Sequence, residues 1–139
     1  MRNSSAKCLF ICSLLVTGCA ADIFGKTYVE INSNLSAATT LTVHCKSKND
    51  DLGDHTITST RAWGFKFRPN FFKTTLFFCS FAWPNEFHRF DIYDENRDEC
   101  TECIWTVFAN GPCKLNETRG IDFCYPWKAS MQLGRKPLM

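Results

Sequence analysis

Residues 63–67 read Trp-Gly-Phe-Lys-Phe, a stretch that places an aromatic side chain at every second position. This alternation is typical of a β-strand with one buried side and one side that faces solvent. The same period of two recurs in four further short segments, at residues 29–32, 41–45, 90–93 and 103–108. The sequence therefore predicts a chain built mainly from short, half-buried strands.

Residues 75–81, Thr-Leu-Phe-Phe-Cys-Ser-Phe, are apolar at nearly every position, which predicts a central strand covered on both faces. Turn-forming residues separate the strands at 49–54, 69–70, 84–85 and 110–112. No long stretch shows a helical apolar stripe with caps. We expect an all-β fold, a small antiparallel β-sandwich of about 7–9 short strands. Its expected core contains Trp63, Phe65, Phe67, Phe77, Cys79, Trp105 and Val107.

The N-terminal segment has the three parts of a secretory signal peptide. Arg2 and Lys7 precede an apolar run at residues 8–16, and small residues follow at 17–21. The run is shorter than the roughly 20 apolar residues that a membrane-spanning helix needs. We expect a signal peptide at residues 1–21, cleaved after Ala20 or Ala21, with Gly25 as an alternative site. The secreted, extracellular part is then a domain at residues 22–127 and a flexible tail at 128–139, without membrane insertion.

The chain holds nine cysteines, of which three lie in the expected signal peptide. Six remain, namely Cys45, Cys79, Cys100, Cys103, Cys113 and Cys124. An even number in a secreted protein favours three disulfides, which six cysteines can form in 15 pairings. The spacing of Cys100 and Cys103 also fits a zinc ligand pair, but Cys113 and Cys124 are too far apart for the usual second pair.

The charge of the mature chain argues against a nucleic-acid partner. The full chain has 16 basic and 14 acidic side chains, and the basic excess disappears without Arg2 and Lys7. Proteins that bind phosphate backbones need a basic surface. Two glycosylation sequons, at Asn34 and Asn116, are expected at the surface of a secreted domain.

The residue types of an active site are present but poorly arranged. His44 is adjacent to Cys45, and neighbouring side chains of a strand point to opposite faces, so they cannot form a nucleophile pair. The acidic cluster at residues 50–54 lacks the later bidentate glutamate of an EF-hand loop, and a solvated turn is expected. We expect no enzyme activity, no cofactor and no metal.

Several motifs resemble those of one known family. Residues 44–55 read His-Cys-Lys-Ser-Lys-Asn-Asp-Asp-Leu-Gly-Asp-His, and aromatic segments follow at 63–67 and 75–83. Cys-Ile-Trp at 103–105 and Asn-Gly-Pro-Cys at 110–113 come after them. From about Tyr28 to Trp127, the order and spacing of these motifs resemble the plant self-incompatibility protein family, also called S-protein homologues.

The resemblance implies a small secreted β-sandwich held by disulfides. Four of the six cysteines match the family's core pattern, and Cys100 and Cys124 look like an additional pair. On this basis we expect the disulfides Cys45–Cys113, Cys79–Cys103 and Cys100–Cys124. Founding members of the family are female determinants of pollen rejection and act as ligands for a receptor on incompatible pollen.

We therefore expect a secreted, non-enzymatic signalling ligand, monomeric, that acts through an unidentified cell-surface receptor protein. The alternatives are a secreted defence effector and a hydrolase or nuclease. A secreted ribonuclease needs a pair of catalytic histidines, and His44 and His55 stand in other sequence contexts.

The expected recognition surface is the acid-rich segment 94–102. Because so many acids are costly to bury, we expect this loop to be solvated, tethered by Cys100 and suited to a basic partner. The residues expected to contact the receptor are Asp94, Glu95, Asn96, Arg97, Asp98 and Glu99. The rival surface, residues 48–54, belongs to the family motif and is expected to be part of the scaffold.

Overall fold

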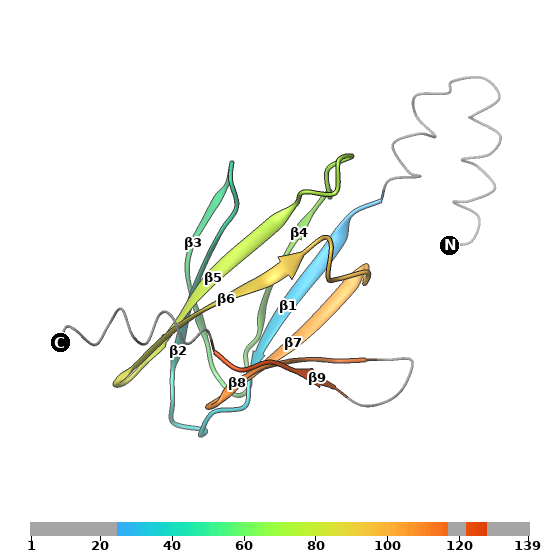
Figure 1. Ribbon diagram of the computed structural model, residues 1–139. Helices are drawn as coiled ribbons and strands as arrows, with labels where there is room; N and C mark the ends of the chain where they lie inside the picture. The colour runs from blue at the N-terminus through green and yellow to red at the C-terminus, as the bar shows by residue number, and fades with distance from the viewer. Residues whose placement is uncertain (1–24, 117–121, 128–139) are drawn as a thin grey trace, which may run out of the picture.

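The computed structural model describes residues 25–116 and 122–127, and these residues form nine β-strands (Figure 1). The strands are β1 (Thr27–Ser33), β2 (Leu41–Lys46), β3 (Asp51–Ile57), β4 (Trp63–Phe67), β5 (Leu76–Trp83), β6 (Glu86–Asp94), β7 (Glu102–Phe108), β8 (Gly111–Lys114) and β9 (Phe123–Cys124). The expected signal peptide and C-terminal tail lie outside the described residues. In the described part, no helix is long and apolar enough to cross a bilayer.

The strands form a five-stranded sheet in the order β4-β1-β7-β8-β9 and a four-stranded sheet in the order β3-β2-β5-β6. The predicted all-β sandwich is confirmed. One pair departs from an antiparallel arrangement, because β1 and β7 run parallel, with Tyr28 beside Glu102 and Ser33 beside Val107. Parallel neighbours need a long crossover connection, and here the whole four-stranded sheet lies between β1 and β7 in the chain.

The core lies between the two sheets and combines side chains from both. Trp105 and Val107 of β7 are fully buried, as are Phe81 of β5 and Ile92 of β6. Four of the seven expected core residues are buried, whereas Trp63, Phe65 and Phe67 are half-buried and pack against the core. All three belong to β4, an edge strand, so their rings cover the rim of the sandwich.

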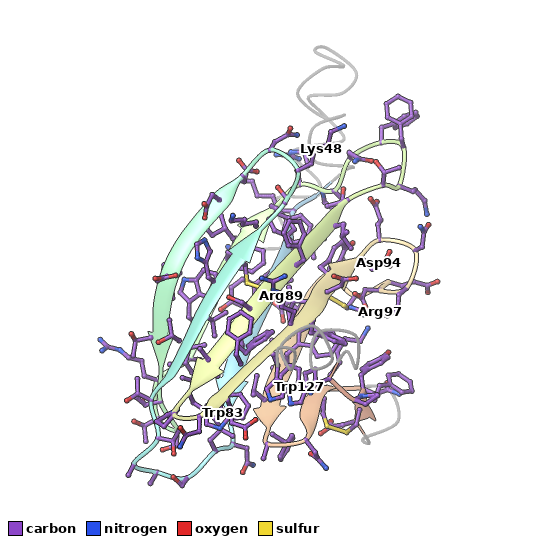
Figure 2. The ribbon with its side chains drawn as sticks, turned by 60° about the vertical axis from the view of Figure 1, so that its left-hand side comes forward. Lys48, Trp83, Arg89, Asp94, Arg97 and Trp127 are labelled. Carbon is purple, nitrogen blue, oxygen red and sulfur yellow. A yellow bond between two sulfur atoms is a disulfide. The ribbon has the colours of Figure 1, made fainter. Side chains whose placement is uncertain are left out.

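Strand β5 is central in its sheet, but the prediction that both of its faces are covered is wrong. Phe77, Cys79 and Phe81 point into the core, whereas Leu76 and Phe78 are 37% and 41% exposed. The second sheet covers only the inner face. Figure 2 looks onto the open face, with Arg89 near its middle, Lys48 toward one end and Trp83 toward the other.

Two strands occupy segments that the sequence analysis assigned to turns. Strand β3 begins at Asp51, so the turn after β2 is shorter than expected, and Ser47 Oγ accepts the backbone N–H of Asp50 in it. Strand β8 contains Pro112, whose carbonyl accepts the N–H of Tyr125. A proline is tolerated at this position because it has no N–H that would need a partner. Its carbonyl can still accept a hydrogen bond.

The six cysteines form three disulfides, and the expected pairing is wrong. The bonds are Cys45–Cys79, Cys100–Cys103 and Cys113–Cys124. Cys45 is directly opposite Cys79 in the β2/β5 register, and Cys113 is opposite Cys124 in the β8/β9 register. Each disulfide therefore lies within one sheet or one loop, and the two sheets are held together by side-chain packing.

Candidate recognition surface

The acid-rich segment forms a loop, here called the acidic loop (residues 94–102), that joins β6 of one sheet to β7 of the other. Its far end is closed by the Cys100–Cys103 disulfide. At its near end, the N–H groups of Arg97 and Asp98 donate to the carbonyl of Asp94, which gives the loop a tight first turn. The backbone of the loop is therefore fixed at both ends.

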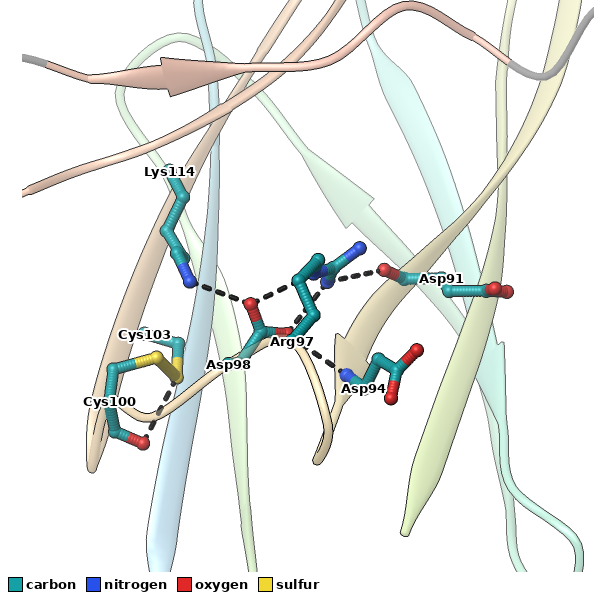
Figure 3. The surroundings of a disulfide bond; sticks show 7 residues. All are labelled: Asp91, Asp94, Arg97, Asp98, Cys100, Cys103 and Lys114. Carbon is teal, nitrogen blue, oxygen red and sulfur yellow. Dashed lines mark hydrogen bonds and ion pairs between the residues drawn. A yellow bond between two sulfur atoms is a disulfide. The ribbon is translucent and has the colours of Figure 1, made fainter. Parts of the chain in front are cut away.

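Asp98 is the centre of this loop and lies inside the protein (Figure 3), where its side chain is fully buried. Its carboxylate accepts two hydrogen bonds from the Arg97 guanidinium, at 2.9 Å from Nε and 2.7 Å from Nη2. Lys114 Nζ of β8 donates a third at 2.6 Å, and the backbone N–H of Asp94 donates a fourth at 2.9 Å. The buried carboxylate thus connects the acidic loop to β8.

Burial by itself raises the pKa of Asp98, but this effect is outweighed by its partners. The hydrogen bonds from Arg97, Lys114 and the Asp94 backbone stabilise the charged form and hold the pKa below its usual range. Arg97 is in turn seated among three rings, with its guanidinium carbon 5.1 Å from the Phe90 centroid and 5.3 Å from those of Trp105 and Tyr125. Stacked arginine of this kind is a favourable cation–π arrangement.

The expectation that the whole loop is solvated is wrong at Asp98, because two cations from different elements compensate its charge. Arg97 is also turned inward and only partly exposed. Asp94 and Glu95 are half-buried, while Asn96 and Glu99 are exposed. Of the six residues expected to contact a receptor, Arg97 and Asp98 therefore hold the loop in place. The other four remain predicted contact residues.

A groove of about 910 Å³ separates the acidic loop from the connection between β4 and β5. Tyr93, Glu95 and Glu99 line one side of it, and Arg68 and Lys73 line the other. The two segments also touch, because Thr75 donates its N–H to Glu95 Oε1 at 3.2 Å. This end of the sandwich thus carries acidic and basic groups on opposite walls of one groove.

The rival surface, residues 48–54, lies on the β2–β3 hairpin and is organised around His44. His44 Nε2 is 2.5 Å from Asp51 Oδ1, and Nδ1 is 2.8 Å from Asp54 Oδ1. The hydrogen bonds with His44 and with the N–H of Gly53 lower the pKa of Asp51. Both carboxylates are exposed, so this arrangement lies on the protein surface.

The three histidines do not form a catalytic pair. His44 is on the outer face of the four-stranded sheet, whereas His55 lies opposite the buried Val43 and stacks on Trp63 at 4.0 Å. His88 is buried on β6, with Nε2 bound to Glu86 and its ring stacked on Trp127 at 4.6 Å. His55 and His88 belong to the two opposite edge strands of the sheet. The hypothesis of a histidine-pair nuclease gains no support from this geometry.

The metal alternatives from the sequence have no matching geometry in residues 25–116 and 122–127. The four cysteines of the zinc hypothesis are consumed by two disulfides. In the same residues, the histidine, cysteine and acidic side chains form no cluster that could hold a metal ion. The sequon asparagines differ in exposure, since Asn34 is exposed and Asn116 is half-buried.

Three residues with structural roles were not identified from the sequence, and two of them, Lys114 and Tyr125, support the site. Lys114 binds Asp98 from 16 positions away, and Tyr125 covers the Arg97 guanidinium. Trp127 closes the opposite end of the core, against Phe81 and His88, and donates its indole N–H to the carbonyl of Ala109. Lys114, Tyr125 and Trp127 follow the last strand motif without a periodic pattern, so nothing in the local sequence indicates that they have these roles.

Comparison with known proteins identifies relatives over nearly the whole described domain. The family model for the plant self-incompatibility protein S1 matches residues 28–127. S-protein homolog 2 of Arabidopsis thaliana is 49% identical over 114 residues, which cover 76% of this chain and 71% of that protein. S-protein homolog 5 of the same plant is 42% identical over 131 residues, covering 92% of this chain and all of that protein.

A solved structure has the same fold. It belongs to the self-incompatibility protein homologues, described as "a widespread family of small, highly stable, secreted proteins from plants". The two structures align with a TM-score of 0.58 over 78% of this chain and 99% of the other, at 16% sequence identity. The fold, the family match and the identities to the S-protein homologues agree, and the chain belongs to the plant self-incompatibility protein S1 family.

Proposed function

We propose that this chain is a secreted, non-enzymatic signalling ligand that acts through a cell-surface receptor protein in pollen–pistil recognition or rejection. The observation that carries the proposal is the family match, which spans residues 28–127 and so includes the whole strand scaffold and its loops. The N-terminal segment with the pattern of a signal peptide supports secretion. The disulfides are consistent with an oxidising extracellular environment.

The acidic loop is the proposed receptor contact. Asp98 and the Cys100–Cys103 disulfide fix its backbone, so binding would order few additional residues. Its remaining acids, Asp94, Glu95, Glu99 and Glu102, are available at the rim to attract a basic surface. A rigid frame that presents variable charged side chains on a loop is a common basis for specific recognition.

The proposal is tested by binding of the labelled, purified protein to intact pollen and pistil cells. Saturable binding that is lost after protease treatment of the cell surface is expected. Glu95→Gln/Glu99→Gln removes two charges while an amide oxygen stays in place for the Thr75 N–H, and it is expected to slow association. Added salt should weaken the wild type more than this variant.

Asp51→Asn/Asp54→Asn is the matched control, because it removes two exposed acids from β3, the edge strand of the four-stranded sheet on the side opposite to β6 and the acidic loop. It should bind like the wild type. Non-saturable or protease-resistant binding would contradict a receptor protein. Equal binding by the two double variants would move the contact away from the acidic loop. The alternative functions, a defence effector or a hydrolase, are favoured by no particular contact in the described residues.

A further inference from the structure

The connection between β4 and β5, here called the Phe71 loop (residues 68–75), carries two phenylalanines that project into solvent. Phe71 is 78% exposed and Phe72 is 79% exposed. All other exposed large apolar side chains in the described part of the chain are 45% exposed or less. The two rings contact each other edge to face, with centroids 5.6 Å apart. They form a compact apolar tip rather than part of the core.

The tip is held in a fixed shape by Asn70. Its Oδ1 accepts the backbone N–H groups of Phe72 at 2.9 Å and Thr74 at 3.1 Å, and its Nδ2 donates to Thr74 Oγ1. Lys73 takes a left-handed backbone conformation, with φ of 60°, to complete the turn. A loop with this many internal bonds presents the two rings without the entropy loss of a flexible loop.

Most backbone N–H groups of this loop are hydrogen-bonded within the protein and so do not depend on water as a partner. The N–H of Asn70 donates to Thr75 Oγ1, that of Lys73 to the Asn70 carbonyl and that of Thr75 to Glu95. Together with Phe72 and Thr74, at least five of the six N–H groups of residues 70–75 have partners within the protein. Moving an unpaired N–H out of water is costly. This tip can therefore enter an apolar medium at a low cost in desolvation.

The charged side chains of the Phe71 loop itself are cationic. Arg68 and Lys73 are both exposed, and the segment from Arg68 to Thr75 contains no acid. Glu95 and Glu99 lie on the facing wall of the groove, in the acidic loop, and Glu95 binds the segment at Thr75, at its base, rather than at its tip. Aromatic side chains flanked by Lys and Arg are typical of protein segments that rest in the interface of an anionic membrane.

We propose that the Phe71 loop docks the protein peripherally on an anionic lipid surface, with both phenyl rings inserted at the headgroup boundary and Arg68 and Lys73 on the lipid phosphates. A protein pocket could donate and accept hydrogen bonds along the loop, but lipid tails cannot, and at least five N–H groups of residues 70–75 are already paired within the protein. In this contact only side chains enter the headgroup boundary. No segment of the backbone crosses the bilayer.

The orientation of the fold is consistent with this contact. Figure 1 shows the β4–β5 connection at the end of the sandwich where β1 begins, while β1 ends at the opposite side. Phe67, just before the loop, pairs with Thr27 at the start of β1, and the Asn34 sequon follows the end of β1. Seven strand residues span about 23 Å, so a glycan on Asn34 would point away from the lipid surface.

The experiment is flotation of the full folded chain with vesicles of phosphatidylcholine alone or with added phosphatidylserine. Stronger binding to the anionic vesicles is expected. Phe71→Ser/Phe72→Ser should lower the partition coefficient about tenfold or more, and Arg68→Gln/Lys73→Asn should abolish the preference for phosphatidylserine. Asparagine is chosen at position 73 because it tolerates a left-handed backbone.

The matched control is Phe87→Ser/Phe123→Ser, which removes two other exposed rings, 42% and 45% exposed, from outside the Phe71 loop. It should bind like the wild type, and an unchanged thermal midpoint shows that each variant is folded. Asn70→Ala keeps both rings and both cations but removes the acceptor of two N–H groups, and it should weaken vesicle binding about tenfold.

Three results would overturn the proposal. The first is no binding of the wild type to either vesicle. The second is equal loss of binding in the control and the Phe71→Ser/Phe72→Ser variant. The third is unchanged vesicle binding by the Phe71→Ser/Phe72→Ser variant together with a loss of its protease-sensitive binding to pollen or pistil cells, which would assign the tip to a protein pocket instead.

Discussion

The acidic loop holds its central carboxylate inside the protein, whereas the β2–β3 hairpin at residues 48–54 holds its carboxylates on the surface. Asp98 is buried between Arg97 and Lys114, while Asp51 and Asp54 are exposed on either side of His44. In each case an acid is paired with a base. The difference is that Asp98 links two elements, the loop and β8, and the His44 pairs stay within one hairpin.

This difference determines what each region can contribute to stability. A buried ion pair is weak evidence for net stability, but removal of one partner leaves an uncompensated buried charge. An exposed pair is screened by water and salt, and it contributes little. We therefore expect substitution of Asp98 in the acidic loop to affect folding and substitutions in the hairpin to affect only the local surface charge.

The largest expected effect is that of Asp98→Ala. This substitution leaves the Lys114 ammonium, whose side chain is only 11% exposed, without its carboxylate partner. It also removes the acceptor of two N–H groups of Arg97. The free energy of unfolding should fall by about 3–5 kcal/mol, measured by denaturant titration. Asp98→Leu/Lys114→Met, which removes the buried pair together, should lose less than Asp98→Ala alone. An equal or greater loss in the double variant would show that the cost comes from packing or from the unpaired Arg97, and not from the unpaired Lys114.

The disulfides provide the next largest effect, because one lies beside each of the two regions. Cys45–Cys79 closes a chain segment of 34 residues that includes the hairpin, and Cys100–Cys103 closes one of 3 where the acidic loop meets β7. In the chain-entropy model, Cys45→Ala/Cys79→Ala should cost about 3–4 kcal/mol and Cys100→Ala/Cys103→Ala about half as much. Thermal unfolding of the two variants measures this. The reverse order would indicate that the short disulfide acts on the native acidic loop rather than on the unfolded chain.

Most strands could be predicted from the sequence, but the residues that pair across the fold could not. The alternation at β1, β2, β4 and β7 predicted those strands, because the period of two reports directly on burial of one face. Strand β3 carries polar residues at an exposed edge and shows no such pattern. The pairings of Cys45 with Cys79 and of Asp98 with Lys114 depend on the register and order of distant strands, which no local pattern encodes.

The acidic loop and the hairpin are also expected to differ in how they change the stability of the protein at low pH. The pKa of Asp98 is lowered in the folded state, so its contribution to stability is present above the unfolded-state value of about 3.9. This contribution is lost as the pH falls through the lower, folded-state value. Asp98→Asn should therefore flatten the fall in stability below about pH 4. The pKa of Asp51 is lowered as well, but this group is exposed, and Asp51→Asn should leave the acid limb nearly unchanged.

The smallest expected effect is that of Asp51→Asn/Asp54→Asn, which removes both carboxylates from His44. At about 0.15 M salt the thermal midpoint should not change measurably, because exposed pairs of this kind contribute little to stability in water and salt weakens them further. At low salt the loss of attraction should become detectable as a small decrease. His44→Gln should give the same small decrease, since it breaks the same two contacts from the other side. A large decrease at high salt in either variant would mean that the hairpin, like the acidic loop, contributes to the stability of the fold through its charged groups.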